Sequence, residues 1–106
     1  MDGAIAARRL GELGNPTRLA IFRLLVKAGP QGLSVGEIQA RLSVPASTLA
    51  FHLRGLVAAD LVAQEREGRV VWCRPRHDTL NAVLAFLKEE CCTGFGDVLG
   101  RREGAA

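Results

Sequence analysis

The sequence predicts a small, mainly α-helical fold that carries one β-hairpin. Three observations support this prediction: helix start and stop signals divide the first 60 residues, two short β-like runs flank Glu67-Gly68, and another apolar helical pattern follows Pro75. The chain has 106 residues, of which 48% are hydrophobic and 24% are charged. We therefore expect one globular domain over residues 1–95, followed by a flexible C-terminal tail over residues 96–106.

Clear helix start and stop signals predict the first two helices. The first helix runs from about Ala4 to Leu13 and ends at Gly14. Asn15-Pro16 then indicates a helix start, with asparagine as the N-cap and proline at the first helical position. The second helix is apolar on most sides, as a central core helix should be, and Gly29-Pro30 ends it.

A short third helix and a longer fourth helix follow. Ser34 and Glu37 form the capping-box pattern at the start of the third helix. Ser43-Val44-Pro45 makes a tight break, and the fourth helix continues to about Ala59. A short helix, a tight turn and a longer helix are typical of helix-turn-helix organisation.

The last elements are a hairpin and a fifth helix. The two strands are expected at Leu61–Arg66 and Arg69–Arg74, with Glu67-Gly68 between them, because glycine allows the positive φ of a tight turn. The fifth helix runs from near Asp78 to about Cys91, with Thr93-Gly94 as its stop. The predicted fold is thus a winged helix-turn-helix. The wide apolar surface of its last helix suggests a second partner and therefore a dimer.

The fourth helix has one apolar side and one polar side. Helical periodicity groups five residues on the side expected to face the core: Leu49, Leu53, Leu56, Val57 and Asp60. The opposite side and the hairpin tip carry the candidate DNA-binding residues: Ser47, Thr48, Phe51, His52, Arg54, Arg66 and Arg69. Residues 41–76 contain six arginines and three carboxylates, a balance that favours an anionic partner.

Each candidate has a functional and a structural interpretation. Ser47 and Thr48 suit phosphate or base contacts, or they only cap the helix. Phe51 suits contact with a thymine methyl group, or it covers a local hydrophobic gap. His52 is either a base reader or a packed edge residue. Arg54 suits a phosphate or a guanine edge, and the hairpin arginines either follow the DNA backbone or only solubilise the turn.

Several segments resemble the ArsR/SmtB family of metalloregulatory repressors. Residues Asn15–Phe22 resemble its N-P-T-R-L-x-I-L segment, Pro45–Leu53 its recognition helix, and Leu56–Val62 with Arg66–Arg69 its wing. The resemblance covers roughly residues 5–92. It implies a homodimer built on the first and last helices. It also implies repression of a metal- or metalloid-resistance operon, which is relieved when the inducer binds.

Cys91 and Cys92 are the candidate metal ligands. Vicinal thiolates favour soft, sulfur-seeking ions. The pair resembles the C-terminal Cys-Cys site of an ArsR subgroup that senses trivalent arsenic or antimony. No third thiol follows it, and the third helix lacks the cysteines of the other well-known family site. Inorganic arsenite therefore needs a third ligand, whereas a methylated arsenite needs only two thiolates, and the sequence leaves this choice open.

The remaining predictions are exclusions and alternatives. Cys73 is expected to be a packed residue on the second wing strand. The main alternative keeps DNA binding but makes the thiols a redox or persulfide sensor, and another is a winged-helix protein-interaction module. No catalytic constellation is evident, so an enzyme is not expected, and no cofactor is required. With no secretion signal or membrane-spanning run, we expect a cytoplasmic protein.

Overall fold

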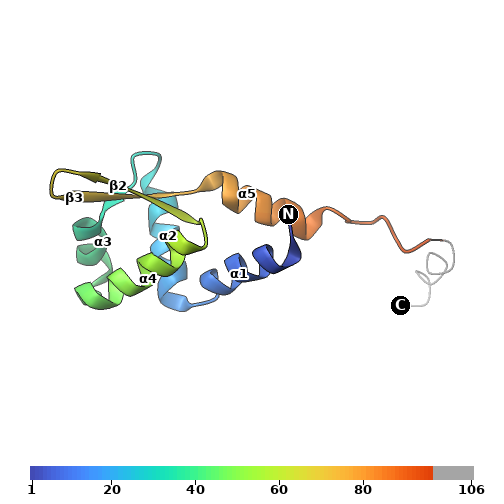
Figure 1. Cartoon of the computed structure of the whole chain (residues 1–106), viewed down its shortest axis with the longest axis horizontal. Coiled ribbons are helices and arrows are strands. Elements are labelled where there is room, and N and C mark those ends of the chain that lie inside the picture. The colour runs from blue at the N-terminus through green and yellow to red at the C-terminus, as the bar shows by residue number, and fades with distance from the viewer. Residues whose placement is uncertain (97–106) are drawn as a thin grey trace.

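The computed structural model describes residues 1–96 and confirms the predicted fold class (Figure 1). Five helices and three strands are present in this part of the chain: α1 Gly3–Leu13, α2 Pro16–Ala28, β1 Leu33–Ser34, α3 Val35–Leu42, α4 Ala46–Ala58, β2 Val62–Glu67, β3 Val70–Pro75 and α5 His77–Lys88. The predicted tail, residues 96–106, lies outside the described residues except for Gly96.

The two predicted capping motifs form as expected. The Asn15 side chain accepts hydrogen bonds from the backbone N–H groups of Thr17 (2.9 Å) and Arg18 (3.1 Å) at the start of α2. Ser34 Oγ accepts from the N–H of Glu37 (3.1 Å), and the N–H of Ser34 donates to Glu37 Oε1 (2.9 Å). This capping box lowers the pKa of Glu37, chiefly through the bond from the Ser34 backbone. Both helix starts are therefore fixed by local chemistry.

The sheet contains a strand that the sequence analysis did not predict. Its order is β1-β3-β2, and β1 pairs with β3 so that Leu33 lies opposite Cys73. Two residues are too few to show the alternation that predicts a strand. In the wing, Glu67 pairs with Val70, so the turn is Gly68-Arg69 rather than Glu67-Gly68. Gly68 has the expected positive φ of 62°.

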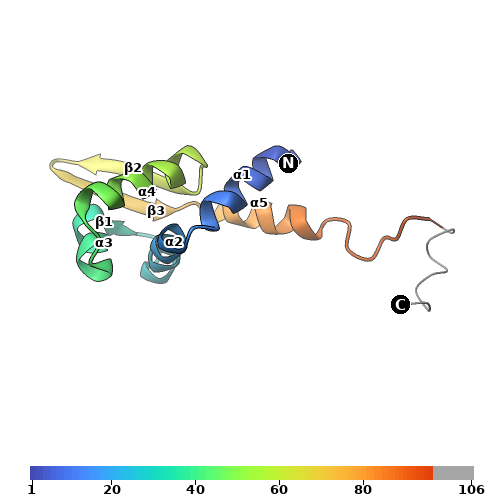
Figure 2. The same cartoon turned by 90° about the horizontal axis from the view of Figure 1, so that it is seen from below.

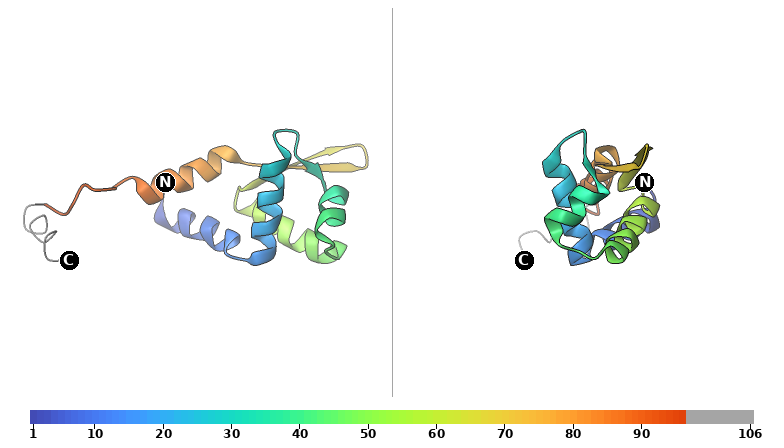
Figure 3. Two further views of the ribbon diagram at one scale, coloured as in Figure 1. Left: turned by 180° about the vertical axis from the view of Figure 1, so that it is seen from behind. Right: turned by 90° about the vertical axis from the view of Figure 1, so that its left-hand side faces the viewer.

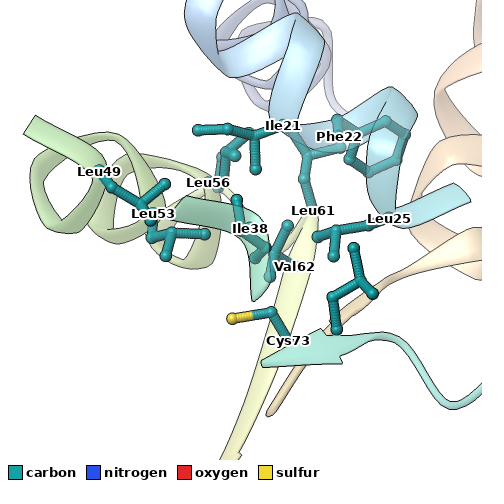
Figure 4. Packing of buried hydrophobic residues seen from close by; sticks show 12 residues of the cluster. Ile21, Phe22, Leu25, Ile38, Leu49, Leu53, Leu56, Leu61, Val62 and Cys73 are labelled. Carbon is teal, nitrogen blue, oxygen red and sulfur yellow. The ribbon is translucent and has the colours of Figure 1, made fainter. Parts of the chain in front are cut away.

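The core lies where α2, α3 and α4 meet the sheet (Figure 4). Its largest fully buried side chains are Ile21, Leu25, Ile38, Leu49, Leu56, Leu61, Val62 and Cys73. The predicted core side of α4 is right for Leu49, Leu53 and Leu56, but it is wrong for Val57, which is 38% exposed. It is also wrong for Asp60. The helix ends at Ala58 and Asp60 has a left-handed φ of 63°, so helical periodicity no longer applies to it.

The last helix is shorter than predicted. It ends at Lys88 instead of about Cys91. Residues 89–92 form a turn in which the N–H of Cys91 donates to the carbonyl of Lys88 (2.8 Å). Glu89 and Glu90 place two negative charges at the negative end of the helix dipole, which disfavours further helix there. Both candidate metal ligands therefore lie outside the helix.

The elements divide between two ends of the molecule. The wing lies at one end, and α1 and α5 lie at the other, with α2 between them (Figures 1, 2 and 3). Helix α1 contacts α2, α4 and α5. The helices of residues 1–96 include none with the length and apolarity that crossing a membrane requires.

Candidate DNA-binding surface and cysteine pair

The outward side of α4 is built by the turn that precedes it. Helix α3 ends at Leu42, its C-cap Ser43 has a left-handed φ of 53°, and α4 begins in a new direction after its N-cap Pro45. The core contacts of Leu49, Leu53 and Leu56 fix the rotation of α4 about its own axis. As a result, Ser47, Thr48, Phe51 and Arg54 are all exposed on the side that faces away from the core.

The helix start does not use its two hydroxyl side chains. The N-cap position of α4 is occupied by Pro45, and no side chain makes a capping hydrogen bond there. The interpretation of Ser47 and Thr48 as helix caps is therefore wrong. Both residues belong to the first turn of α4, where a phosphate is favoured by the free N–H groups and by the helix dipole.

Phe51 and His52 lie in different surroundings. Phe51 is 55% exposed, although the guanidinium carbon of Arg18 lies 5.4 Å from the centre of its ring. His52 is half-buried, and its Nδ1 accepts a hydrogen bond from Arg18 Nε at 3.0 Å. The two rings meet edge to face with their centres 5.4 Å apart. The structure thus leaves Phe51 open to a partner and gives His52 a contact on the protein side.

The three candidate arginines carry uncompensated charge. Arg54, Arg66 and Arg69 are exposed, and none of them pairs with a carboxylate in residues 1–96. By contrast, Arg74 lies 3.8 Å from Glu65, and Arg76 lies 3.2 Å from Asp60. Unpaired arginines on α4 and the wing suit an anionic backbone, since each phosphate contact that they make releases a counterion.

Cys91 and Cys92 come together at the end of α5. Their sulfur atoms are 2.9 Å apart, both side chains are exposed, and Cys92 has a left-handed φ of 66°. In a regular helix, neighbouring side chains diverge by about 100°, so the departure from the helix is what brings the sulfurs together. The hydrogen bond with Cys92, and to a lesser extent desolvation, raises the pKa of Cys91.

Cys73 and the residues around the cysteine pair differ from a metal site. Cys73 is fully buried in the core, where burial raises its pKa, and the prediction of a packed residue is confirmed. Among residues 1–96, no group of three or more His, Cys, Asp and Glu side chains is placed to hold a metal ion. A third ligand for an ion on the cysteine pair is therefore not supplied by a His, Cys, Asp or Glu side chain of residues 1–96 as they are arranged in this subunit.

Apolar side chains remain exposed on the two helices at the far end of the molecule. Helix α5 exposes Leu84 and Leu87, and the N-terminal region exposes Met1, Ile5 and Leu10. Because α1 and α5 pack against each other, these residues occur on one neighbouring pair of helices. A concentration of large apolar side chains on one pair of helices is typical of a protein interface.

Comparison with known proteins identifies the class of molecule. Residues 13–65 match the family model described as a helix-turn-helix domain. The chain is 31% identical over 83 residues to the uncharacterized HTH-type transcriptional regulator YceK of Bacillus subtilis, covering 78% of this chain and 82% of that protein. It is also 31% identical over 88 residues to the nodulation protein NolR of Rhizobium meliloti, covering 83% of this chain and 70% of NolR.

Solved structures place the chain within this class. An ArsR-like transcriptional regulator from Rhodococcus superposes with a TM-score of 0.71 at 28% identity, over 81% of this chain and 78% of that one. A possible transcriptional regulator for arsenical resistance gives 0.66 at 26%, over 92% and 95%. A homodimeric winged helix-turn-helix DNA-binding domain from Mycobacterium bovis gives 0.64 at 27%, over 84% and 82%. The chain belongs to the ArsR-type family of winged helix-turn-helix transcriptional regulators.

Sequence reasoning missed the polar residues that connect α4 to the rest of the fold. Arg18 and Glu12 form an ion pair beside α4, and Asp60 contacts Arg76 at 3.2 Å and Arg9 at 3.6 Å. The sequence signal for this cluster was Gly55, in the interior of α4. Glycine is unfavourable in a helix interior, so its presence there indicates that a neighbouring group needs the space.

Proposed function

We propose that this regulator represses transcription as a homodimer bound to operator DNA, and that trivalent arsenic or antimony releases it by binding Cys91 and Cys92. The observation that carries the sensing half is the thiol pair itself. Two exposed sulfurs lie 2.9 Å apart, outside the regular helix and directly after α5. Such a pair offers two soft ligands to one thiophilic ion, and no helix has to unwind before the two sulfurs converge.

In the proposed complex with DNA, α4 is the recognition helix and lies in the major groove. Ser47 and Thr48 at its start contact phosphate, Phe51 contacts a thymine methyl group, and Arg54 pairs with a phosphate or a guanine edge. Arg66 and Arg69 of the wing follow the backbone or the minor groove. The exposed positions of these side chains and the unpaired charge of the three arginines support this arrangement.

The homodimer is built on α1 and α5. The exposed apolar residues of these helices support this assignment, as does the homodimeric state of the similar domain from Mycobacterium bovis. A two-fold dimer presents two copies of α4 to half-sites about one DNA turn, or 34–36 Å, apart. Since the thiol pair follows α5 directly, an ion bound there acts next to the helix that sets this spacing.

The proposed release mechanism is linkage between the two sites. The inducer binds the thiolates, the ends of α5 rearrange, and the spacing of the recognition helices becomes less favourable for DNA. A coupling free energy of about 1–3 kcal/mol, typical of allosteric proteins, lowers operator affinity by about 5- to 150-fold. By reciprocity, bound operator lowers inducer affinity by the same factor.

The test is a titration of a protein–DNA complex. Duplexes are first selected from a randomised pool with the wild-type protein, and release is followed by fluorescence anisotropy. Inorganic trivalent arsenic, its methylated form and antimony are added separately to the wild type, to Cys91→Ser/Cys92→Ser and to the control Cys73→Ala. We expect release from the wild type and the control only. Release of the double variant at the same concentrations would refute the sensing role.

A redox function for the same pair is the second candidate, favoured by the short sulfur–sulfur distance. In this case, peroxide takes two electrons from the two thiols, which form a disulfide with each other, and the peroxide is reduced to two waters. Peroxide would then release DNA from the wild type without any metalloid, and a reductant would restore binding. Metalloid-dependent release that is insensitive to peroxide would exclude this alternative.

A further inference from the structure

A polar cluster connects α1 and α2 to the recognition helix. Arg18 of α2 is its centre, with a side chain only 16% exposed. Its guanidinium forms an ion pair with Glu12 of α1, and its Nε donates to His52 Nδ1 at 3.0 Å. Arg18 therefore joins three helices, and it contacts the His52 ring at Nδ1.

Gly55 provides the space for this cluster. A Cβ built on Gly55 would lie 2.8 Å from Glu12 Oε2 and 3.1 Å from Arg18 Cζ, both closer than ordinary contacts. The ion pair consequently crosses α4 at the one place where that helix has no side chain. Glycine costs about 1 kcal/mol relative to alanine in a helix interior. We attribute its presence here to the close approach of Arg18 and Glu12, which a Cβ would obstruct.

The contact with Arg18 determines the protonation pattern of His52. Arginine can only donate, so Nδ1 has to be the accepting nitrogen. In a neutral imidazole the proton then resides on Nε2. Residues 1–96 contain no fully buried side-chain nitrogen or oxygen without a hydrogen-bond partner, so Nε2, which has no partner there, is not fully buried. His52 thus carries an unpartnered N–H donor on the helix proposed to contact DNA.

We propose that Arg18 is a positioning residue that fixes the tautomer of His52, so that Nε2–H donates a hydrogen bond to an acceptor of the operator. The acceptor is a purine N7, a guanine O6, a thymine O4 or a phosphate oxygen, and a cytosine amino group is excluded because it also donates. This inference rests on the proposed placement of α4 in the major groove. It assigns to His52 both the protein contact and the DNA contact that the sequence presented as alternatives.

The tautomer is measured without DNA. Long-range proton–nitrogen NMR spectra of the ¹⁵N-labelled chain at neutral pH distinguish the two neutral forms of His52. We expect the Nε2–H form in the wild type and a mixture in Arg18→Met. The control Arg23→Met removes the same charge from the same helix at an exposed position and leaves the spectrum unchanged. An Nδ1–H form in the wild type, or an unchanged spectrum in Arg18→Met, overturns the inference.

A second pair of variants does not depend on the folding of Arg18→Met. Glutamine at position 52 places its amide near Nε2 and keeps a donor there, whereas asparagine places its amide near Nδ1. We expect His52→Gln to bind the selected duplex nearly as well as the wild type, and His52→Asn to bind about tenfold more weakly, the loss of one hydrogen bond. Equal losses in both variants contradict a donor at Nε2.

Modified duplexes identify the acceptor. Single 7-deazapurine substitutions remove a purine N7, and single methylphosphonates remove a charged phosphate oxygen. Base analogues that lack guanine O6 or thymine O4 remove the two remaining acceptors. We expect one substitution to weaken the wild type about tenfold and to leave His52→Asn unaffected, since that variant has already lost the contact. If no substitution distinguishes the two proteins, the DNA contact of His52 is refuted. If the wild-type protein binds no duplex, the proposed function is refuted, whichever tautomer His52 adopts.

Discussion

The exposed leucines of α5 allow the proposed homodimer to be tested quantitatively. The perturbation is the double substitution Leu84→Ala/Leu87→Ala, which shortens two side chains on the solvent-facing side of the helix. Leu84 is 48% exposed and Leu87 is 57% exposed in the single chain. Because both are already half in water, their truncation should change the stability of the folded subunit by less than it changes association.

The size of the effect follows from the area that remains to be buried. Full burial of a leucine side chain is favourable by about 1.5–3 kcal/mol, so an interface that covers the exposed half of each gains about 1 kcal/mol per residue. A two-fold interface contains both residues twice. Alanine retains its Cβ, so we expect the variant to lose about 3 kcal/mol of association free energy, or about a hundredfold in the dimer dissociation constant.

Sedimentation equilibrium over a concentration series measures this constant directly. The control is Val70→Ala, which truncates an exposed apolar residue of the wing, at the opposite end of the molecule (Figure 1). We expect the control to dimerise like the wild type and the double variant to dissociate. A wild type that stays monomeric at every concentration, or a variant that dimerises as tightly as the wild type, would refute an interface on α5.

Three further predictions concern stability and thiol chemistry. Leu56→Ala should lower the free energy of unfolding by about 2–5 kcal/mol, measured by urea denaturation, because it leaves a cavity where α4 enters the core; a loss below 1 kcal/mol would contradict this packing. Ser34→Ala should cost about 1 kcal/mol by the same measurement, because it removes one half of the capping box, and Ser34→Thr should recover most of it. The alkylation rate of Cys91 by iodoacetamide, followed by mass spectrometry, should have its pH midpoint above the ordinary thiol value of about 8.5, since only the thiolate reacts and the bond with Cys92 raises the pKa of Cys91. In Cys92→Ala this midpoint should fall, and an unchanged midpoint would contradict the assigned cause.

Short-range chemistry explains why much of the fold could be predicted from the sequence. The Asn15-Pro16 start and the capping box of Ser34 and Glu37 involve residues no more than three positions apart. The apolar spacing of α4 likewise predicted which of its sides faces the core for Leu49, Leu53 and Leu56. Signals of this kind depend on the helix itself and require no knowledge of what packs against it.

The elements that were missed or misplaced depend on distant partners. Strand β1 exists because Leu33 meets Cys73, and the wing turn shifts by one residue because Glu67 pairs with Val70. The end of α5 was placed too late because Thr93-Gly94 is a stop signal, while the helix had already ended at Lys88. In each case the outcome was decided by pairing or electrostatics that the local pattern does not contain.

The sequence by itself determined the order of the five helices and the wing hairpin, the core positions Leu49, Leu53 and Leu56 of α4, and the presence of two adjacent thiols. Only the tertiary structure decided how these thiols and α4 are presented. It ended α5 before Cys91, which brought the two sulfurs together, and it placed Arg18 against His52 across 34 positions of the chain. The physical reason is that a hydrogen bond between packed helices depends on their relative positions, and these are fixed by the whole core rather than by neighbouring residues.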